Sequence, residues 1–121
     1  KVQVSIINFT SIGAEQGFSN NPGYAATKGA VKQLSKALAV EWGKYGIRVN
    51  NIVPGYTNTP MNSKSWNDPK LKKQRSDNTV FGRWAEPEEM VGPVIFLASK
   101  ASSYITGTDL VVDGGWLVKG M

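Results

Sequence analysis

Short apolar runs rich in β-branched residues occur three times along the chain, and each predicts a strand. They cover residues 4–9, 47–53 and 109–112, and Pro54 and Gly55 stop the second of them. Apolar runs of this length are typical of strands buried in a sheet. The pattern therefore predicts three buried strands that are joined by longer segments.

Two of the joining segments repeat apolar residues at helical spacing. The first runs from about residue 24 to 44 and ends near Gly46, and its predicted core stripe consists of Val31, Leu34 and Leu38. The second begins at Pro87, a residue suited to the first position of a helix, and continues to about residue 98. Pro93 lies inside it, where a proline removes a backbone hydrogen bond, so we expect a local kink.

Strands that alternate with helices of this length predict parallel β-α-β units with right-handed crossovers, and therefore an α/β fold. Residues 56–83 do not fit this alternation, because they are polar and irregular apart from a short helix expected around residues 69–75. Such a stretch is long for a loop in a compact domain, and long loops are often lids. We expect residues 56–83 to form a lid over a substrate site.

Composition limits the chemistry that this chain can perform. Its 121 residues, 40% of them hydrophobic, suffice for one small globular domain at most. The chain has no cysteine and no histidine, which excludes thiolate zinc sites and removes the commonest metal ligand, so we expect no metal. No apolar run approaches the roughly 20 residues that span a bilayer. We expect a cytoplasmic protein without a membrane partner.

The formal net charge of +5 is unevenly distributed. Five cations cluster in one polar segment of the expected lid, namely Lys64, Lys70, Lys72, Lys73 and Arg75. No aromatic stacking platform or DNA-binding motif accompanies them, so we expect no nucleic-acid partner. Two interpretations stay open, a solvated surface or an anion-attracting lid over an active site.

A serine, a tyrosine and a lysine carry the strongest chemical signal. Tyr24 lies thirteen positions after Ser11, and Lys28 follows one helical turn after Tyr24. Side chains four residues apart share one helix face, and an ammonium close to a phenol favours the phenolate. A serine hydroxyl brought alongside can hydrogen-bond the oxygen that gains or loses a proton. We therefore predict Ser11, Tyr24 and Lys28 as a catalytic group for proton exchange with an alcohol or carbonyl oxygen.

Together with further landmarks, this group makes the chain resemble the C-terminal half of a short-chain dehydrogenase/reductase. The landmarks are Thr10-Ser11, Tyr24-x-x-x-Lys28, Arg48-Val49-Asn50, Pro54-Gly55-x-x-x-Thr59 and Asp113-Gly114-Gly115. The resemblance implies a doubly wound, Rossmann-like parallel sheet, of which residues 1–121 form a partial domain. It also implies an enzyme that transfers a hydride between NAD or NADP and a secondary alcohol or ketone. Gly82-Arg83-Trp84 and Gly115-Trp116-Leu117 resemble the members that act on sugar acids and polyols.

The resemblance implies a role for each candidate residue. Tyr24 is the general acid/base, Lys28 also contacts the nicotinamide ribose, and Ser11 orients the substrate oxygen. Thr10, the adjacent hydroxyl, is the alternative to Ser11.

The turn that begins at Pro54 and Gly55 is expected to bind the cofactor, because doubly wound sheets bind ligands at the carboxyl ends of strands. By resemblance, the backbone of Thr57 meets the nicotinamide carboxamide, and the hydroxyl of Thr59 meets the carboxamide or a phosphate. The alternative for both threonines is to stabilise the turn. Asn50 is interpreted as structural.

One part of the family pattern is missing. The Gly-rich turn that cradles a cofactor pyrophosphate does not occur, since Gly13 and Gly17 do not form that motif. We therefore expect the N-terminal, cofactor-cradling half of the fold to be absent from this chain, and the first strand to have an unpaired edge.

Two other functions stay open: a 3-oxoacyl-carrier-protein reductase, and a non-catalytic fragment or oligomerisation module. The apolar segment at residues 116–121 predicts a homodimer or homotetramer.

Overall fold

Three strands form one parallel sheet in the order β1-β2-β3, and the computed structural model describes residues 3–119. The strands are β1 (Val4–Phe9), β2 (Ile47–Pro54) and β3 (Asp109–Val112). β1 pairs with β2 along its whole length, whereas β3 pairs only with the last four residues of β2. The three predicted strands are confirmed, and β1 has one unpaired edge among the described residues.

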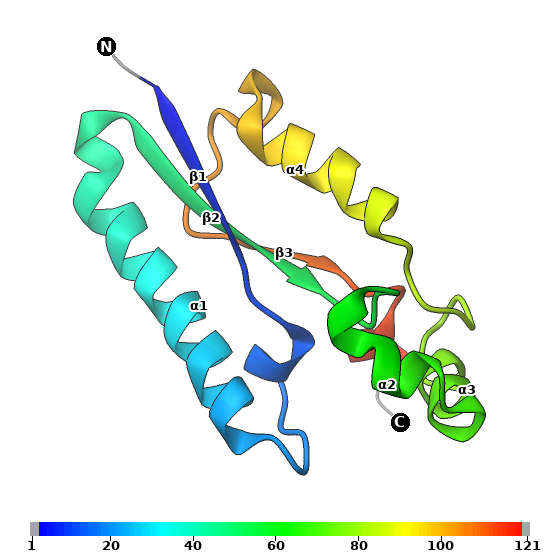
Figure 1. Ribbon diagram of the computed structural model, residues 1–121. Coiled ribbons are helices and arrows are strands. Elements are labelled where there is room, and N and C mark those ends of the chain that lie inside the picture. Colours follow the sequence, from blue (N-terminus) through cyan, green and yellow to red (C-terminus); the bar gives the residue numbers. More distant parts are fainter. Residues whose placement is uncertain (1–2, 120–121) are drawn as a thin grey trace.

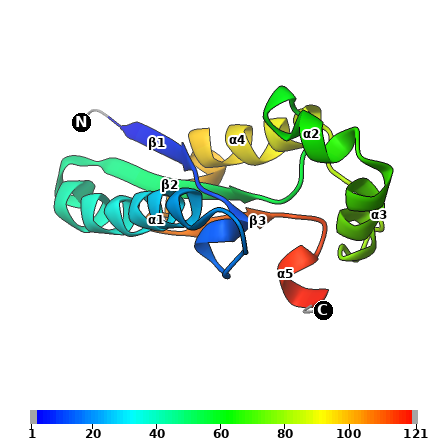
Figure 2. The same ribbon diagram turned by 60° about the horizontal axis from the view of Figure 1, so that its bottom comes forward.

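Helices cover both faces of this sheet. The helices are α1 (Pro22–Trp42), α2 (Ser63–Trp66), α3 (Pro69–Asp77), α4 (Val91–Ala98) and α5 (Trp116–Lys119). α1 lies on one face and α4 on the other, whereas α2, α3 and α5 gather near the carboxyl ends of β2 and β3 (Figures 1 and 2). No helix in residues 3–119 is long and apolar enough to cross a membrane.

α1 begins two residues earlier than predicted because its start is defined by a side-chain cap. Asn21 accepts a hydrogen bond from the backbone N–H of Tyr24 at 3.2 Å, and Pro22 occupies the first helical position. A 3-10 turn at Gly43–Tyr45 follows the helix, and Gly46 ends it with a left-handed φ of 78°. The prediction that Gly46 ends this helical segment is therefore confirmed.

The predicted core stripe of α1 is wrong in part. Leu34 is 55% exposed, and Val31 and Leu38 are only half-buried. The buried residues are instead Ser35 and Ala39, whose small side chains let the helix approach the sheet closely. Apolar periodicity missed this face because its contacts are made by small and polar residues.

The kink expected at Pro93 is also wrong. A 3-10 turn at Pro87–Met90 comes first, stabilised by a capping box between Glu86 and Glu89, and the α-helix begins only at Val91. Pro93 therefore lies in the first turn of α4, where backbone N–H groups have no acceptor within the helix. No interior hydrogen bond is lost.

The core lies between the sheet and α4. Ile52, Met90 and Leu97 form its buried centre, and partly buried apolar residues of β1, β3 and α4 pack around it.

The segment at residues 56–83 contains more helix than predicted. It holds α2 in addition to α3, the helix expected around residues 69–75.

Candidate active site

Ser11 lies two residues after the end of β1, at the carboxyl end of the sheet, where it caps the 3-10 turn η1 (Ile12–Ala14). Its Oγ accepts a hydrogen bond from the N–H of Gly13 at 3.0 Å. This is the structural role expected of a serine at a strand end. It leaves the hydroxyl proton free for a second bond, because a serine hydroxyl both donates and accepts.

Gly13 shows that Ser11 and Tyr24 border the same space. A Cβ atom built at Gly13 would lie 3.4 Å from Ser11 Oγ and 3.8 Å from Tyr24 Cε1. Phe18 Cδ2 would lie 3.7 Å from the same point. The fold therefore brings together two residues that the sequence separates by thirteen positions. A side chain at Gly13 would intrude between them.

Lys28 lies one turn after Tyr24 on the same face of α1. Its Nζ is 5.7 Å from the centroid of the Tyr24 ring and donates a hydrogen bond to the carbonyl of Phe9 at 3.1 Å. That bond holds the ammonium at the carboxyl end of β1, beside the Ser11 turn. Thr10, the alternative to Ser11, is 3% exposed, and its hydroxyl lies 3.4 Å from the carbonyl of Ile52.

The turn after β2 passes very close to the end of β3. The N–H of Gly55 donates to the carbonyl of Val112 at 3.0 Å, and a Cβ at Gly55 would lie 2.9 Å from both Cα and Cβ of Asp113. Real Cβ atoms essentially never approach so closely, so only glycine fits here. Pro54, the last residue of β2, pairs with Val112.

Thr57 and Thr59 differ in how their hydroxyl groups are used. Thr57 is buried, and its Oγ1 donates to the carbonyl of Gly55 at 3.1 Å, which is the turn-stabilising role. The carbonyl of Thr57 accepts from the side chain of Asn62 at 2.9 Å. Thr59 Oγ1 is buried and has no hydrogen-bond partner among the described residues. A buried hydroxyl of this kind fits a hydrogen bond to a bound molecule.

Asn50 ties the loop before β3 to the middle of β2. Its side chain donates to the carbonyl of Ile105 and accepts from the N–H of Thr108, both at 3.0 Å. It is fully buried, so its role is structural.

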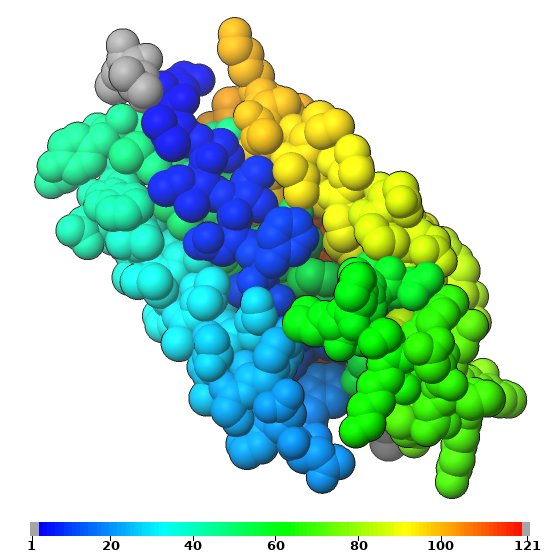
Figure 3. Space-filling view, in the orientation of Figure 1, coloured from blue at the N-terminus to red at the C-terminus, as the bar shows by residue number. Residues whose placement is uncertain are grey.

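Aromatic side chains connect residues 56–83, the segment predicted to be a lid and called the lid below, to the loop after Ser11. The ring centroids of Tyr56 and Trp84 are 5.1 Å apart, those of Tyr56 and Trp116 are 5.0 Å apart, and those of Trp116 and Phe18 are 6.1 Å apart. Trp66 joins the cluster through Trp84 at 5.3 Å. The lid and the start of α1 lie on either side of a hollow on this face (Figure 3).

The apolar patch predicted at residues 116–121 is smaller than expected. Trp116 belongs to the aromatic cluster and Leu117 is half-buried, whereas Val118 is 82% exposed. Residues 120 and 121 lie outside the described part of the chain.

Three of the lid cations have local partners. Lys72 lies over the Trp66 ring at 3.5 Å, Lys73 pairs with Asp77 at 2.6 Å, and Arg83 pairs with Glu89 at 2.7 Å. The hydrogen bond from Arg83 lowers the pKa of Glu89 to about 2. Lys64 and Lys70 are exposed.

Arg75 is the lid cation that turns inward. Its guanidinium lies 4.7 Å from the centroid of the Tyr56 ring, and its Nε is buried without a hydrogen-bond partner among the described residues. Tyr56 belongs to the turn that leads to Thr57 and Thr59, so Arg75 extends toward that turn.

The chain matches a protein-family model and several proteins of known function. A family model described as enoyl-(acyl carrier protein) reductase matches residues 1–117. Gluconate 5-dehydrogenase of Gluconobacter oxydans is 41% identical over 110 residues, which are 91% of this chain and 43% of that protein. Galactitol 2-dehydrogenase (L-tagatose-forming) of Cereibacter sphaeroides is 50% identical over 95 residues, 78% of this chain and 37% of that protein.

A solved structure has the same fold. The crystal structure of a gluconate 5-dehydrogenase from Burkholderia cenocepacia, in complex with NADP and tartrate, superimposes with a TM-score of 0.94 at 39% identity. The match covers 96% of this chain and 46% of that one. This chain therefore spans less than half the length of each of these three proteins.

Proposed function

Because the chain belongs to the short-chain dehydrogenase/reductase family, we propose that the intact protein transfers a hydride between NAD or NADP and a secondary alcohol or ketone. The resemblance to the C-terminal half of this family and the α/β fold with a parallel sheet are confirmed. The observation that carries the proposal is the meeting of Ser11 and Tyr24 around Gly13, with Lys28 one turn away.

In the proposed reaction Tyr24 exchanges the proton. Its phenol gives a proton to the carbonyl oxygen during reduction and takes the hydroxyl proton during oxidation. Lys28 places a positive charge 5.7 Å from the centroid of the Tyr24 ring. Ser11 donates its hydroxyl proton to the same substrate oxygen, since its lone pair already accepts from Gly13.

The turn after β2 is proposed to hold the nicotinamide end of the cofactor, which supplies or accepts the hydride when bound. Thr59 offers its unpartnered buried hydroxyl to the carboxamide or a phosphate. Thr57 offers its backbone, and the glycine at Gly55 lets the turn after Pro54 lie against Asp113. The proposed cofactor is NAD or NADP. The complex of the Burkholderia cenocepacia enzyme with NADP supports NADP.

The proposed substrate is a sugar acid or polyol. The relatives are named for gluconate and galactitol, and the lid brings one cation, Arg75, over the turn. A positive charge there would raise the local concentration of a carboxylate substrate, an effect that salt screens over a Debye length of about 8 Å at physiological ionic strength.

The intact protein should be assayed with both cofactors on gluconate, its neutral polyol counterpart and a short 3-oxoacyl thioester. We expect turnover of gluconate or the polyol, with kcat/KM for gluconate falling as salt is added. Equal efficiency on acid and polyol at low salt would contradict the role of the lid cation. The absence of turnover on every substrate would contradict the enzyme assignment and favour the non-catalytic fragment or oligomerisation module.

A fatty-acid reaction is the second candidate. The description of the matching family model, enoyl-(acyl carrier protein) reductase, favours it. Turnover of the thioester alone would assign the protein to a 3-oxoacyl-carrier-protein reductase.

We further propose that the protein is a cytoplasmic homodimer or homotetramer with a small-molecule substrate. Val118, exposed on α5, is the apolar side chain available for the contact predicted at this segment. A monomeric mass in solution at micromolar concentration would contradict the oligomer.

A further inference from the structure

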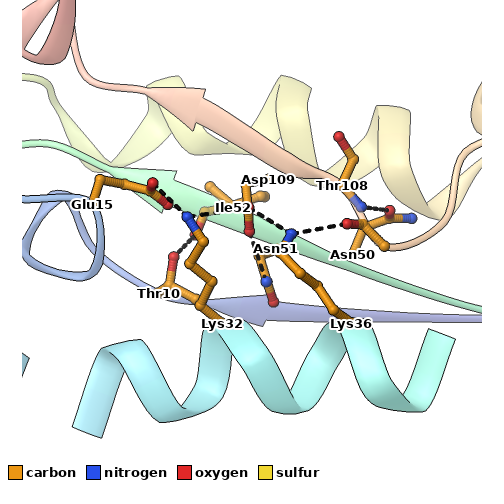
Figure 4. Close-up of polar contacts among 10 residues, drawn as sticks. Thr10, Glu15, Lys32, Lys36, Asn50, Asn51, Ile52, Thr108 and Asp109 are labelled. Atoms are coloured by element: carbon orange, nitrogen blue, oxygen red, sulfur yellow. Dashed lines mark hydrogen bonds and ion pairs between the residues drawn. The ribbon is translucent and has the colours of Figure 1, made fainter. Parts of the chain in front are cut away.

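The catalytic face of α1 continues as a row of lysines. Tyr24, Lys28, Lys32 and Lys36 follow one another at four-residue steps and therefore share one side of the helix. Lys28 donates to the end of β1, as described above. The two lysines beyond it contact acidic side chains from other elements (Figure 4). The row thus connects α1 to the sheet along its length.

Lys32 pairs with Glu15, which directly follows the η1 turn. The Oε2 of Glu15 lies 2.5 Å from the Nζ of Lys32, and the two side chains are 20% and 25% exposed. This hydrogen bond raises the pKa of Lys32 above its ordinary value. The other oxygen of Glu15 is buried and has no hydrogen-bond partner among the described residues. The pair therefore joins the η1 turn directly to α1.

The Lys32 end of this tie is anchored in the sheet. Asp109, the first residue of β3, lies 3.6 Å from the Nζ of Lys32 and 2.8 Å from the Nζ of Lys36. Asn51 of β2 donates to the same carboxylate at 2.9 Å. Burial raises the pKa of Asp109, but the bonds from Lys36 and Asn51 outweigh it, and the net shift is downward. Lys32 is thus held by groups that do not move with the η1 turn.

The η1 turn has few other polar contacts with the rest of the fold. The backbone bonds of Ala14, Glu15 and Gln16 all end on Ser11 or Ile12, within the turn itself. These bonds fix the shape of the turn but not its place relative to α1. Ile12 is buried, and apolar burial is less directional than a hydrogen bond. Ahead of the turn, Phe9 accepts from Lys28 of α1, and the N–H of Thr10 donates to Ile52 of β2. Beyond Ser11, the bond between Glu15 and Lys32 is the side-chain hydrogen bond that joins residues 12–15 to α1 among the described residues.

We propose that Glu15 is a positioning residue, which acts through Lys32 to hold the η1 turn, and with it the Ser11 hydroxyl, in register with Tyr24 on α1. This inference rests on the proposed function. Its physical basis is that proton transfer and substrate orientation depend steeply on geometry, so that a displacement of about 1 Å can lower a rate by about 10²-fold. Glu15 itself does not touch the reacting atoms.

The kinetic test compares Glu15→Gln, Lys32→Met and the double variant of the intact protein, with Lys73→Met as the control for an exposed lysine pair. We expect each single variant to lower kcat by roughly 10–100-fold while KM for the cofactor stays within about twofold. The double variant should lose no more than one single variant, because both remove the same contact. Lys32→Arg, which keeps the charge, should restore most of kcat.

The structural test is amide hydrogen exchange of Ala14, Glu15 and Gln16. Exchange should be at least about tenfold faster in Glu15→Gln than in the wild type, and unchanged in Lys73→Met. If the wild-type protein turns over none of the substrates, the proposed function fails and exchange alone decides this inference. Unchanged exchange, a kcat within about twofold of wild type, or single-variant losses that multiply in the double variant would each overturn it.

Discussion

The two sides of the candidate site are held in different ways. On the α1 side, Lys28, Lys32 and Lys36 reach partners that are 19, 17 and 73 residues away in the chain. In the lid, Lys73 and Arg83 pair with residues only four and six positions away. The lid contacts the rest of the fold through tilted aromatic rings, from Tyr56 through Trp116 to Phe18. It is also bonded to the loop after β3, because the backbone N–H groups of Val80 and Phe81 donate to the carbonyl of Gly114.

This difference matches the role proposed for each side. Hydrogen bonds and ion pairs are directional, so contacts between distant elements fix the candidate catalytic groups in angle as well as in distance. The ion pairs of the lid join side chains that lie close together in the chain, so they do not tie the lid to the candidate catalytic groups. We therefore expect substitutions on the α1 side to change turnover, and substitutions in the lid to change mainly substrate affinity.

The largest difference between the two sides should appear with lysine replacements. Lys28→Met removes the charge 5.7 Å from the Tyr24 ring and should lower turnover by roughly 10²–10³-fold, within the range of general acid–base catalysis. Lys70→Met, an exposed lid residue, is the control and should leave turnover unchanged. Steady-state kinetics at saturating cofactor would measure both. If Lys28→Met keeps a tenth or more of the wild-type turnover, the α1 side does not differ from the lid in the way proposed.

Two glycine substitutions test how closely the site depends on the sheet. Gly55→Ala forces a methyl group to 2.9 Å from Asp113 and should lower the free energy of unfolding by about 1–3 kcal/mol. Gly17→Ala is the matched control, because its added methyl meets no atom within 4 Å. Thermal unfolding of both variants would show the difference. Equal Tm values would mean that the turn after β2 moves away from β3 without cost.

The two threonines of the turn should separate binding from stability. Thr59→Val removes an unpartnered hydroxyl, so it should raise KM for the cofactor by about 2–10-fold without lowering stability. Thr57→Val removes the bond to Gly55 and should lower the free energy of unfolding by about 1 kcal/mol. If Thr59→Val destabilises the protein and leaves KM unchanged, Thr59 is a structural residue.

The smallest effect is expected from the surface pair of Arg83 and Glu89. The pKa of Glu89 is about 2 in the folded chain, below the ordinary 4.5, so its stabilising contribution is complete above about pH 4.5. That contribution is lost as the pH falls from about 4.5 toward 2. Glu89→Gln should therefore lower Tm slightly at neutral pH, and the difference should vanish near pH 2. A difference independent of pH would mean that the ion pair is not its source.

The strands and the long helices could be predicted from the sequence, because buried strands and amphipathic helices leave clear apolar patterns. The face of α1 could not, since Ser35 and Ala39 make its buried contacts and Leu34 points outward. The trio of Ser11, Tyr24 and Lys28 stood out by its spacing, and the fold brings its members together.

Contacts between distant segments were not predictable in the same way. Glu15 has no pattern that points to Lys32, because their meeting depends on how the η1 turn sits against α1. The four-residue spacing from Tyr24 to Lys36 was the one available signal. Likewise, composition alone could not show that the Arg75 side chain packs against Tyr56 whereas the Lys70 side chain is exposed.

The central claim is that Tyr24 exchanges the proton in a nicotinamide-dependent reaction, and Tyr24→Phe in the intact protein tests it most directly. Cofactor binding and single-turnover hydride transfer should be measured on the same preparation. The variant should bind NADPH or NADH about as tightly as the wild type, yet transfer hydride roughly 10²–10⁴-fold more slowly. Hydride transfer at more than about a tenth of the wild-type rate, with binding intact, would contradict the assignment.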